Sequence, residues 1–253
     1  MADNYKISFI AQNDFEKHVA KTIANYNETL KSINLNKFNS NIVDPIKLTF
    51  DKALFKKSIE EIIELEIHRQ RDKSNTNAIG YFHQYMFKYI ANCEVPSHGF
   101  DVIVTRKDST KIYVEMKNKH NTMNSSSAQK TYIGMQNQIL NHPHDMCFLV
   151  ETIAKRSQNI VWRCSVNGLS VEHEKIRRVS MDKFYELVTG IPDAFFQVCK
   201  QLPITIDKLI KTDVVETVKK DTVIEELKSK NPDLLKAIYL LAFETYNGFE
   251  VGK

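Results

Sequence analysis

Helical periodicity covers the first 95 residues and the last 60 or so of this chain. Near the N-terminus, apolar residues recur three or four positions apart; these are Phe15, Val19, Ile23 and Tyr26. The pattern breaks around Pro45, resumes with Ser58 as a candidate N-cap, and is interrupted again by the polar run RDKSNTN before AIGYFHQYMFKYIA. Beyond residue 190 it predicts helices at 192–201, 205–211, 213–229 and 231–246, the last with Asn231 as N-cap and Pro232 as its first residue.

The middle of the chain reads as β-structure. Short apolar, β-branched runs predict strands near 100–105, 111–118, 146–152, 160–166 and 177–179. A helix, SSAQKTYIGMQNQILN, lies between the second and third strands, and MDKFYELVTG follows the last with Ser180 as its cap and Gly190 at its end. This order predicts an α/β fold with a central mixed sheet flanked by helices, and with helical N- and C-terminal parts.

Length and composition fit a soluble protein of one large domain or two modest ones. The 253 residues are 42% hydrophobic and 26% charged, with a net charge of +4. We expect a single domain over 1–253, with a mainly helical part at 1–95, a catalytic core at 96–190 and a helical part at 191–253. No apolar run is long enough for a membrane span, the start lacks the apolar core of a signal peptide, and the four scattered cysteines favour reduced thiols. A cytoplasmic location without membrane contact follows as an expectation.

The stretch GFDVIVTRKDSTKIYVEMKNKHN combines strand residues with charges. With a turn at 106–110, we expect residue 101 to face residue 115 across an antiparallel hairpin, so that Asp101, Glu115 and Lys117 share one face. Two facing carboxylates repel each other unless a divalent cation lies between them, and Mg²⁺ prefers one or two carboxylates plus water and phosphate oxygens. A nearby lysine completes the set needed for metal-assisted phosphodiester hydrolysis.

Two observations weigh on this interpretation. The Glu-x-Lys spacing occurs again at Glu226 and Lys228, where a charged helix predicts a solvated face. The alternative for the hairpin set is a salt-bridged group on a half-exposed strand. The region around it is basic, which suits a phosphate partner but is also typical of a solvated loop.

The Asp…Glu-x-Lys hairpin followed by a helix resembles the PD-(D/E)XK nucleases. More closely, NAIGYFHQYMFKYI, GFDVIV, YVEMKNKHNTMNSSSAQKTYIGMQNQIL and IRRVSMDKFYELVTG resemble the type II restriction endonucleases that recognise GGNCC or its GGWCC subset. The resemblance covers roughly residues 67–190. One departure from the superfamily pattern is Phe100, where a proline often precedes the aspartate.

The resemblance implies roles for the hairpin residues. Asp101 and Glu115 would be metal ligands and Lys117 the catalytic lysine, with Mg²⁺ as cofactor and double-stranded DNA as substrate. The products would carry 5′-phosphates. Enzymes of this kind usually act as homodimers on palindromes, in the bacterial cytoplasm, alongside a DNA methyltransferase encoded by a separate gene.

The polar loop after the second strand offers many hydrogen-bond donors close to the expected site. We expect DNA contacts from this loop and the first turn of the next helix. The candidates are His120, Asn121, Asn124, Ser125, Ser126, Ser127, Gln129 and Lys130. The alternative is a plain capped loop, with Ser125 or Ser126 as N-cap and a solvent-facing first turn.

The helices before the hairpin add two candidates, because superfamily members often supply a further acid or amide from there. Gln84 and Glu64 are the candidates, with Gln84 assigned to the catalytic set. A buried polar residue is the alternative for Gln84 and the preferred interpretation for His83.

Guanine recognition favours arginine, which binds O6 and N7 together. The candidates are Arg156, Arg163, Arg177 and Arg178, with Lys155, Gln158 and Asn159 close to the first. Each arginine taken alone is better explained by surface charge or a salt bridge. Trp162 is expected in the core, and His142 and His144 are expected in a turn rather than in a zinc site.

Two other functions fit the same residues. A repair or junction nuclease of the same superfamily would share the catalytic set but not the sequence preference. A DNA-binding module with an inactive site is opposed by the intact Asp101, Glu115 and Lys117.

Overall fold

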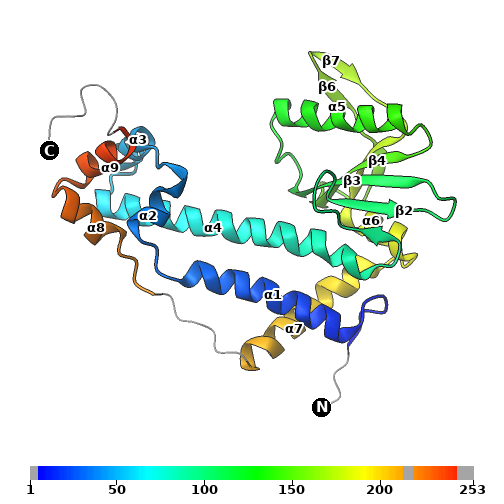
Figure 1. Cartoon of the computed structure of the whole chain (residues 1–253), viewed down its shortest axis with the longest axis horizontal. Helices are drawn as coiled ribbons and strands as arrows, with labels where there is room; N and C mark the ends of the chain where they lie inside the picture. The colour runs from blue at the N-terminus through cyan, green and yellow to red at the C-terminus, as the bar shows by residue number, and fades with distance from the viewer. Residues whose placement is uncertain (1–4, 213–218, 244–253) are drawn as a thin grey trace. The chain divides into compact units, whose positions relative to one another are not determined.

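The computed structural model describes residues 5–212 and 219–243. They divide into two compact units, which we treat separately (Figure 1). The sheet unit falls within Met1–Ile23 and Ala78–Val214, and the helical unit within Ala24–Asn77 and Val215–Lys253. Each unit is thus built from two separate stretches of sequence.

The sheet unit is centred on a six-stranded mixed sheet of order β1-β2-β3-β4-β8-β5. The strands are β1 (Cys93–Glu94), β2 (Val102–Thr105), β3 (Lys111–Lys119), β4 (Met146–Ile153), β5 (Asn159–Val161) and β8 (Ile176–Ser180). A separate hairpin pairs β6 (Cys164–Val166) with β7 (Leu169–Val171). The helices of this unit are α5 (Ser125–Asn141), α6 (Met181–Thr189), α7 (Ala194–Thr212) and the adjoining parts of α1 (Gln12–Leu30) and α4 (Ile59–Met86), followed by the short turn η2 (Phe87–Tyr89).

The two faces of the sheet are covered by different helices (Figure 1). One face carries Val102, Val114 and Phe148 into a large core shared with α1, α4, α6 and α7. The other face packs Cys147 and Leu149 against α5. This confirms the expected mixed sheet with helices on both faces.

The hairpin has the expected register. Val102 pairs with Val114, and Thr105 pairs with Lys111, so the pairing continued by one residue sets Asp101 against Glu115. The run 160–166, expected as one strand, is two: β5 joins the main sheet and β6 the small hairpin. The chain changes sheets at Trp162, whose ring is buried edge-on against Tyr132.

Two expected helix breaks are wrong. The run RDKSNTN continues α4 without interruption, because its polar side chains are compatible with a helix and two of them are bonded: Arg71 to Asp221, and Asn75 to Thr29. The helix α7 runs through Pro203. The amide lost at that proline is offset by the apolar side of α7, which packs on the core.

The last helices begin later than expected. We find α8 at Val223–Lys230 and α9 at Leu234–Phe243. Asn231 ends α8 instead of starting α9, and the carboxylate of Asp233 accepts the first free amides of α9. Residues 213–218 of one expected helix and 244–246 of the other lie outside the described residues.

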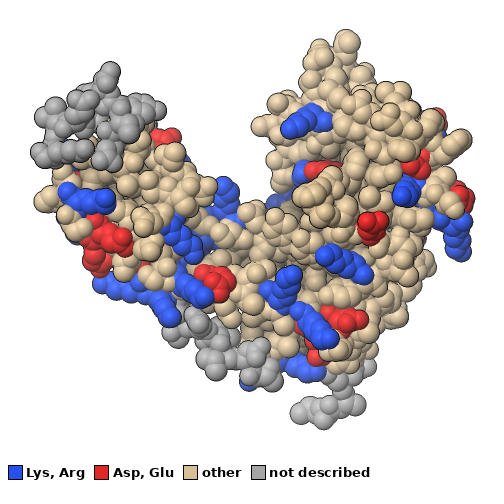
Figure 2. Space-filling view, viewed as in Figure 1, with Lys and Arg blue, Asp and Glu red and all other residues tan. Residues whose placement is uncertain are grey.

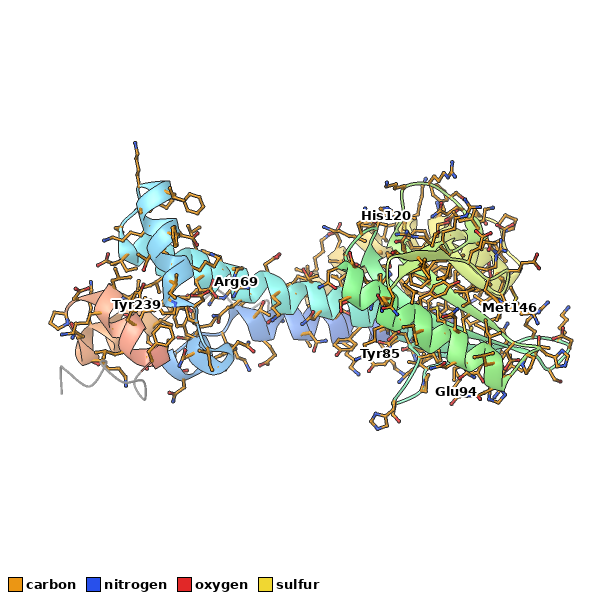
Figure 3. All side chains as sticks on the ribbon, turned by 90° about the horizontal axis from the view of Figure 1, so that it is seen from above. Arg69, Tyr85, Glu94, His120, Met146 and Tyr239 are labelled. Carbon is orange, nitrogen blue, oxygen red and sulfur yellow. The ribbon has the colours of Figure 1, made fainter. Side chains whose placement is uncertain are left out.

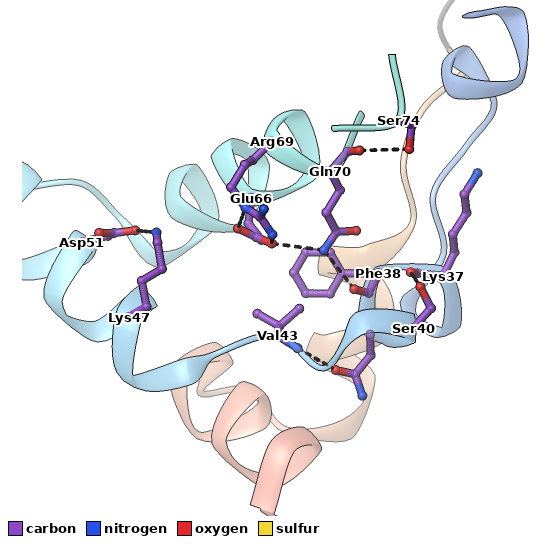
Figure 4. Close-up of polar contacts among 11 residues, drawn as sticks. Lys37, Phe38, Ser40, Val43, Lys47, Asp51, Glu66, Arg69, Gln70 and Ser74 are labelled. Carbon is purple, nitrogen blue, oxygen red and sulfur yellow. Dashed lines mark hydrogen bonds and ion pairs between the residues drawn. The ribbon is translucent and has the colours of Figure 1, made fainter. Parts of the chain in front are cut away.

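The helical unit has its own core. Its further elements are α2 (Leu35–Phe38), η1 (Asn39–Asn41) and α3 (Pro45–Phe55), which pack with α8, α9 and part of α4. Glu66 is 5% exposed, yet it is paired with Arg69 and Gln70, and Gln70 also donates to the carbonyl of Phe38 (Figure 4). The buried charge is therefore compensated.

No helix in the described part of the chain is long and apolar enough to cross a membrane. On the face shown in Figure 2, lysine and arginine are interspersed with acidic residues. The modest net charge is thus not gathered into one basic patch on that face.

Candidate active site

The structure brings the four expected catalytic residues together. The Asp101 carboxylate accepts a hydrogen bond from the Met116 amide at 2.7 Å, and the Lys117 ammonium donates to Glu115 at 2.7 Å. From α4, the Gln84 side-chain amide donates to the Asp101 carbonyl at 3.2 Å. Strand alternation and the antiparallel pairing therefore place Asp101, Glu115 and Lys117 on one face, at the open end of the hairpin.

The charge on Asp101 is poorly compensated. Burial raises the pKa of its carboxyl group above the ordinary value, and the negative charge of Glu115 raises it further. The Met116 amide and the Lys117 ammonium oppose this shift but do not cancel it. A carboxylate in this position favours a cation beside it.

These residues fit a divalent ion held by oxygen atoms. Among residues 5–212 and 219–243, no three His, Cys, Asp or Glu side chains form a cluster able to hold an ion alone. Mg²⁺ needs no such cluster, since one or two carboxylates with water and phosphate oxygens suffice. Asp101 and Glu115 provide those two carboxylates.

Removing the charge of Asp101 should stabilise the metal-free protein. Because the folded-state pKa is raised, ionising Asp101 costs more in the folded than in the unfolded chain, so stability is lost as pH rises through that pKa. We expect Asp101→Asn to raise the unfolding free energy by about 0.5–2 kcal/mol at neutral pH in EDTA. Near pH 3, where the wild-type carboxyl is also neutral, the gain should disappear.

Thermal unfolding at the two pH values measures this difference. If Asp101 is a ligand, Mg²⁺ should raise the melting temperature of the wild-type protein and not that of Asp101→Asn, because the ion would bind only the intact folded site. A variant less stable than wild type at neutral pH in EDTA would show that the Asp101 charge is well compensated.

A second charged group lies beside Lys117 on the same face of the sheet. Glu151 on β4 is the parallel partner of Lys117, and it is 1% exposed. One of its oxygens pairs with Arg178 on β8, and the other lies 3.2 Å from His120 Nδ1. Arg178 also approaches His120 Nδ1 at 2.7 Å.

This network adds one residue that the sequence analysis missed and relates two that it named. In Figure 3, His120 and Met146 mark opposite ends of the sheet, and the network belongs to the His120 end. A signal was present, because Glu151 is an acid within the apolar run CFLVETI. Its partners can be identified only once β4 is placed parallel to β3, and β8 parallel to β4.

The loop candidates lie at the start of α5. Asn124 is the N-cap, and its side chain accepts from the Ser127 amide at 2.8 Å, so the cap is neither Ser125 nor Ser126. Asn121 has a left-handed backbone with φ of 58°. Three exposed serines and Lys130 follow in the first turns of α5, and Gln129 bonds Asn167 of the β6–β7 turn.

The arginine candidates are separated by the fold. Arg177 points to the opposite face from Arg178 and bonds Asn159, while Arg163 pairs with Glu172 on the small hairpin. Arg156 is exposed in the loop before β5, and Gln158 ties that loop to Ser180 through its backbone. Of these arginines, Arg178 lies within the polar network beside Lys117.

The remaining candidates lie elsewhere. Glu64 is exposed on the part of α4 that belongs to the helical unit. Desolvation first, and then the neighbouring His18, lower the pKa of His83 to about 4, so it is a neutral histidine next to the core. His142 and His144 are exposed in the turn before β4, whereas the Cys147 side chain is buried.

Comparison with known proteins gives matches over most of the chain. The model of the Eco47II restriction endonuclease family matches residues 7–211. The type II restriction enzyme Sau96I of Staphylococcus aureus is 30% identical over 217 residues, which cover 83% of this chain and 83% of that protein. The type II restriction enzyme Eco47II of Escherichia coli is 28% identical over 183 residues, covering 68% of this chain and 75% of that enzyme.

Proposed function

The chain belongs to the Eco47II restriction endonuclease family, and from this premise we propose that it cuts both strands of DNA at GGNCC or GGWCC with the aid of Mg²⁺. The products would carry 5′-phosphates. The observation that carries the proposal is the meeting of Asp101 with Glu115 and Lys117 on one face of the sheet, where the Asp101 carboxyl has a raised pKa.

Each residue of this set has a distinct part in hydrolysis. Asp101 and Glu115 would hold the ion, which supplies Lewis-acid activation of the scissile phosphate when bound. Lys117 is 29% exposed, so its ammonium can turn from Glu115 to hold the attacking water or a phosphate oxygen. Gln84 supports the site by fixing the Asp101 backbone from α4.

The neighbouring network of Glu151, Arg178 and His120 would hold another phosphate of the DNA strand that is cut. A guanidinium only donates and a carboxylate only accepts, so His120 Nδ1 accepts from Arg178 when the ring proton is on Nε2 and donates to Glu151 when it is on Nδ1. The first tautomer leaves His120 Nε2–H and the exposed part of Arg178 as donors at the end of β3. Glu151, buried behind them, pairs with Arg178 and so positions the guanidinium.

The remaining contacts are assigned by position. Asn121, Asn124, Ser125, Ser126, Ser127, Gln129 and Lys130 would meet the DNA backbone beside the cut. Arg156 is our choice for a guanine reader, because it is exposed on a loop that follows the strand of Glu151. Gln158, Arg163 and Arg177 are secondary candidates.

The biological setting follows from the same family. We propose a bacterial cytoplasmic enzyme acting as a homodimer, with both units forming one nuclease domain. A separate methyltransferase would protect the host DNA without forming a stable complex with this protein.

Digestion of a plasmid with mapped ends tests the function. We expect discrete fragments in Mg²⁺ and none in EDTA, with every sequenced end at GGNCC or GGWCC and ligatable without added kinase. Ends scattered over the plasmid, or confined to branched DNA, would favour the repair or junction nuclease. DNA binding without any cleavage would favour the inactive binding module.

The same assay tests Arg156. Replacing a base reader costs about 1–3 kcal/mol and relaxes discrimination at one position, whereas replacing a phosphate contact weakens all sequences alike. Arg156→Ala is expected to cut additional sites that differ from the wild-type site at one G·C pair. Cutting at unchanged sites with lower overall affinity would make Arg156 a backbone contact.

A further inference from the structure

The helix α3 in the helical unit carries apolar side chains on two sides. Pro45 and Leu48 are buried, and Leu48 belongs to the core that α3 shares with α9. On another side, Ile46 is 51%, Phe50 63% and Leu54 74% exposed. We call these three residues the α3 stripe; their spacing of four positions sets them in one line along the helix.

The stripe is extended at both ends by further exposed apolar residues. Ile42 is 71% exposed before α3, and Phe55 is 60% exposed at its end. Isolated exposed apolar residues are common, but three large ones aligned along a helix indicate an interaction surface.

The backbone before α3 supports the same conclusion. Ile42 has φ of 41°, which is unfavourable for a β-branched residue. Two hydrogen bonds to Asn39 hold this turn, one from the Ile42 amide at 2.9 Å and one from the Val43 amide at 3.2 Å. The turn therefore holds an apolar side chain in solvent at the cost of backbone strain, and a partner that covers this side chain would offset that cost.

We propose that the α3 stripe is the seam between two copies of this chain, packed as antiparallel helices about a two-fold axis near Phe50. Ile46 of one copy then meets Leu54 of the other, so that the stripe is complementary to itself. The ends also match in charge, because Asp44 at the start of α3 lies opposite Lys56 at its end. Beside the stripe, Lys47 and Asp51 neutralise each other (Figure 4).

The size of the surface suits a weak to moderate dimer. The stripe and Ile42 are four large side chains, each offering on the order of 100 Å², and give about 800 Å² over both copies, within the range of weak interfaces. The choice of a second copy also rests on the proposed function. Each copy of the chain contains one set of Asp101, Glu115 and Lys117. Cutting both DNA strands of a two-fold symmetric site calls for two such sets.

Molecular mass in solution tests the seam without DNA or metal. The wild-type protein should sediment at twice its 29.3 kDa chain mass, and Phe50→Asp combined with Leu54→Asp should sediment as a single chain with unchanged circular dichroism. Leu169→Asp, an equally exposed leucine of the sheet unit, is the matched control and should remain dimeric. Double-strand cutting by the stripe variant should fall by about a hundredfold, since it loses the gain from two linked sites.

A cross-linking experiment keeps the test decisive if the double variant misfolds. Phe50→Cys near the axis should form an intermolecular disulfide on mild oxidation, because a residue on a two-fold axis meets its own copy. Lys52→Cys, exposed on another side of α3, should not. Both are made with Cys199→Ser, because Cys199 is the exposed native thiol.

A wild-type protein that is monomeric at every concentration would overturn the proposed seam. That result is expected if residues 244–253 of the same chain cover the stripe. A stripe variant that stays dimeric would place the interface elsewhere. Neither result touches the proposed cleavage activity, and a stripe dimer that cuts no DNA would refute that activity alone.

Discussion

Glu115→Gln and Lys117→Met are expected to lower the rate of DNA cleavage in Mg²⁺ by about a thousandfold or more, while the protein keeps its fold. Under the proposed mechanism each removes a charge that would act at the reacting phosphate: Glu115 as a ligand of the ion, and Lys117 as the group beside the attacking water. Their mutual ion pair is partly exposed, with side chains 25% and 29% accessible, so its loss costs little stability. Single-turnover cleavage of a defined duplex and circular dichroism measure the two effects.

The chain contains its own matched control. Glu226 and Lys228 form the same Glu-x-Lys tripeptide on α8, where Glu226 bonds Thr222 and Lys228 pairs with Glu60. Glu226→Gln and Lys228→Met should cut at the wild-type rate. Cleavage near the wild-type rate by Glu115→Gln or Lys117→Met would move the active site elsewhere.

Glu151→Ala is expected to produce the largest loss of stability. Glu151 is almost fully buried and pairs with Arg178, which already has a buried Nε atom without a partner. Deleting the carboxylate leaves the Arg178 charge uncompensated, at a cost of about 3–5 kcal/mol. For a chain of this length, that corresponds to a fall in melting temperature of about 6–20 °C.

A double-mutant cycle separates the ion pair from simple loss of packing. Glu151→Ala combined with Arg178→Met should recover much of the stability lost by Glu151→Ala, because the unpaired charge is gone. Strictly additive losses would mean that Arg178 does not depend on Glu151. We also expect the recovered double variant to bind DNA more weakly than wild type, since it lacks a phosphate donor.

The hairpin was predictable because its determinants are local. The turn after Thr105 and the alternation of apolar residues fix the register of the hairpin. That register alone places Asp101 opposite Glu115. The helix α6 was equally local, with Gly190 in the left-handed conformation that ends it.

The parts that could not be predicted depend on contacts between distant segments. Glu151 joins the site only because β4 lies parallel to β3, a pairing across a helix that no short pattern specifies. Within α4, Arg71 pairs with Asp221, which lies far along the chain and could not be identified as its partner from the sequence. Strand alternation places Arg177 and Arg178 on opposite faces of the sheet. Which of the two faces the site is known only once β8 is placed beside β4.

The most direct test of the metal-dependent active site is to measure the ion itself. Mn²⁺, as a paramagnetic substitute for Mg²⁺, can be titrated into wild-type protein and the Asp101→Asn, Glu115→Gln and Lys117→Met variants, each with bound duplex, and followed by electron paramagnetic resonance. We expect Asp101→Asn and Glu115→Gln to lose the bound ion, whereas Lys117→Met should bind it and not cut. Wild-type Mn²⁺ binding by both Asp101→Asn and Glu115→Gln would contradict the assignment of Asp101 and Glu115 as the ligands of the catalytic ion.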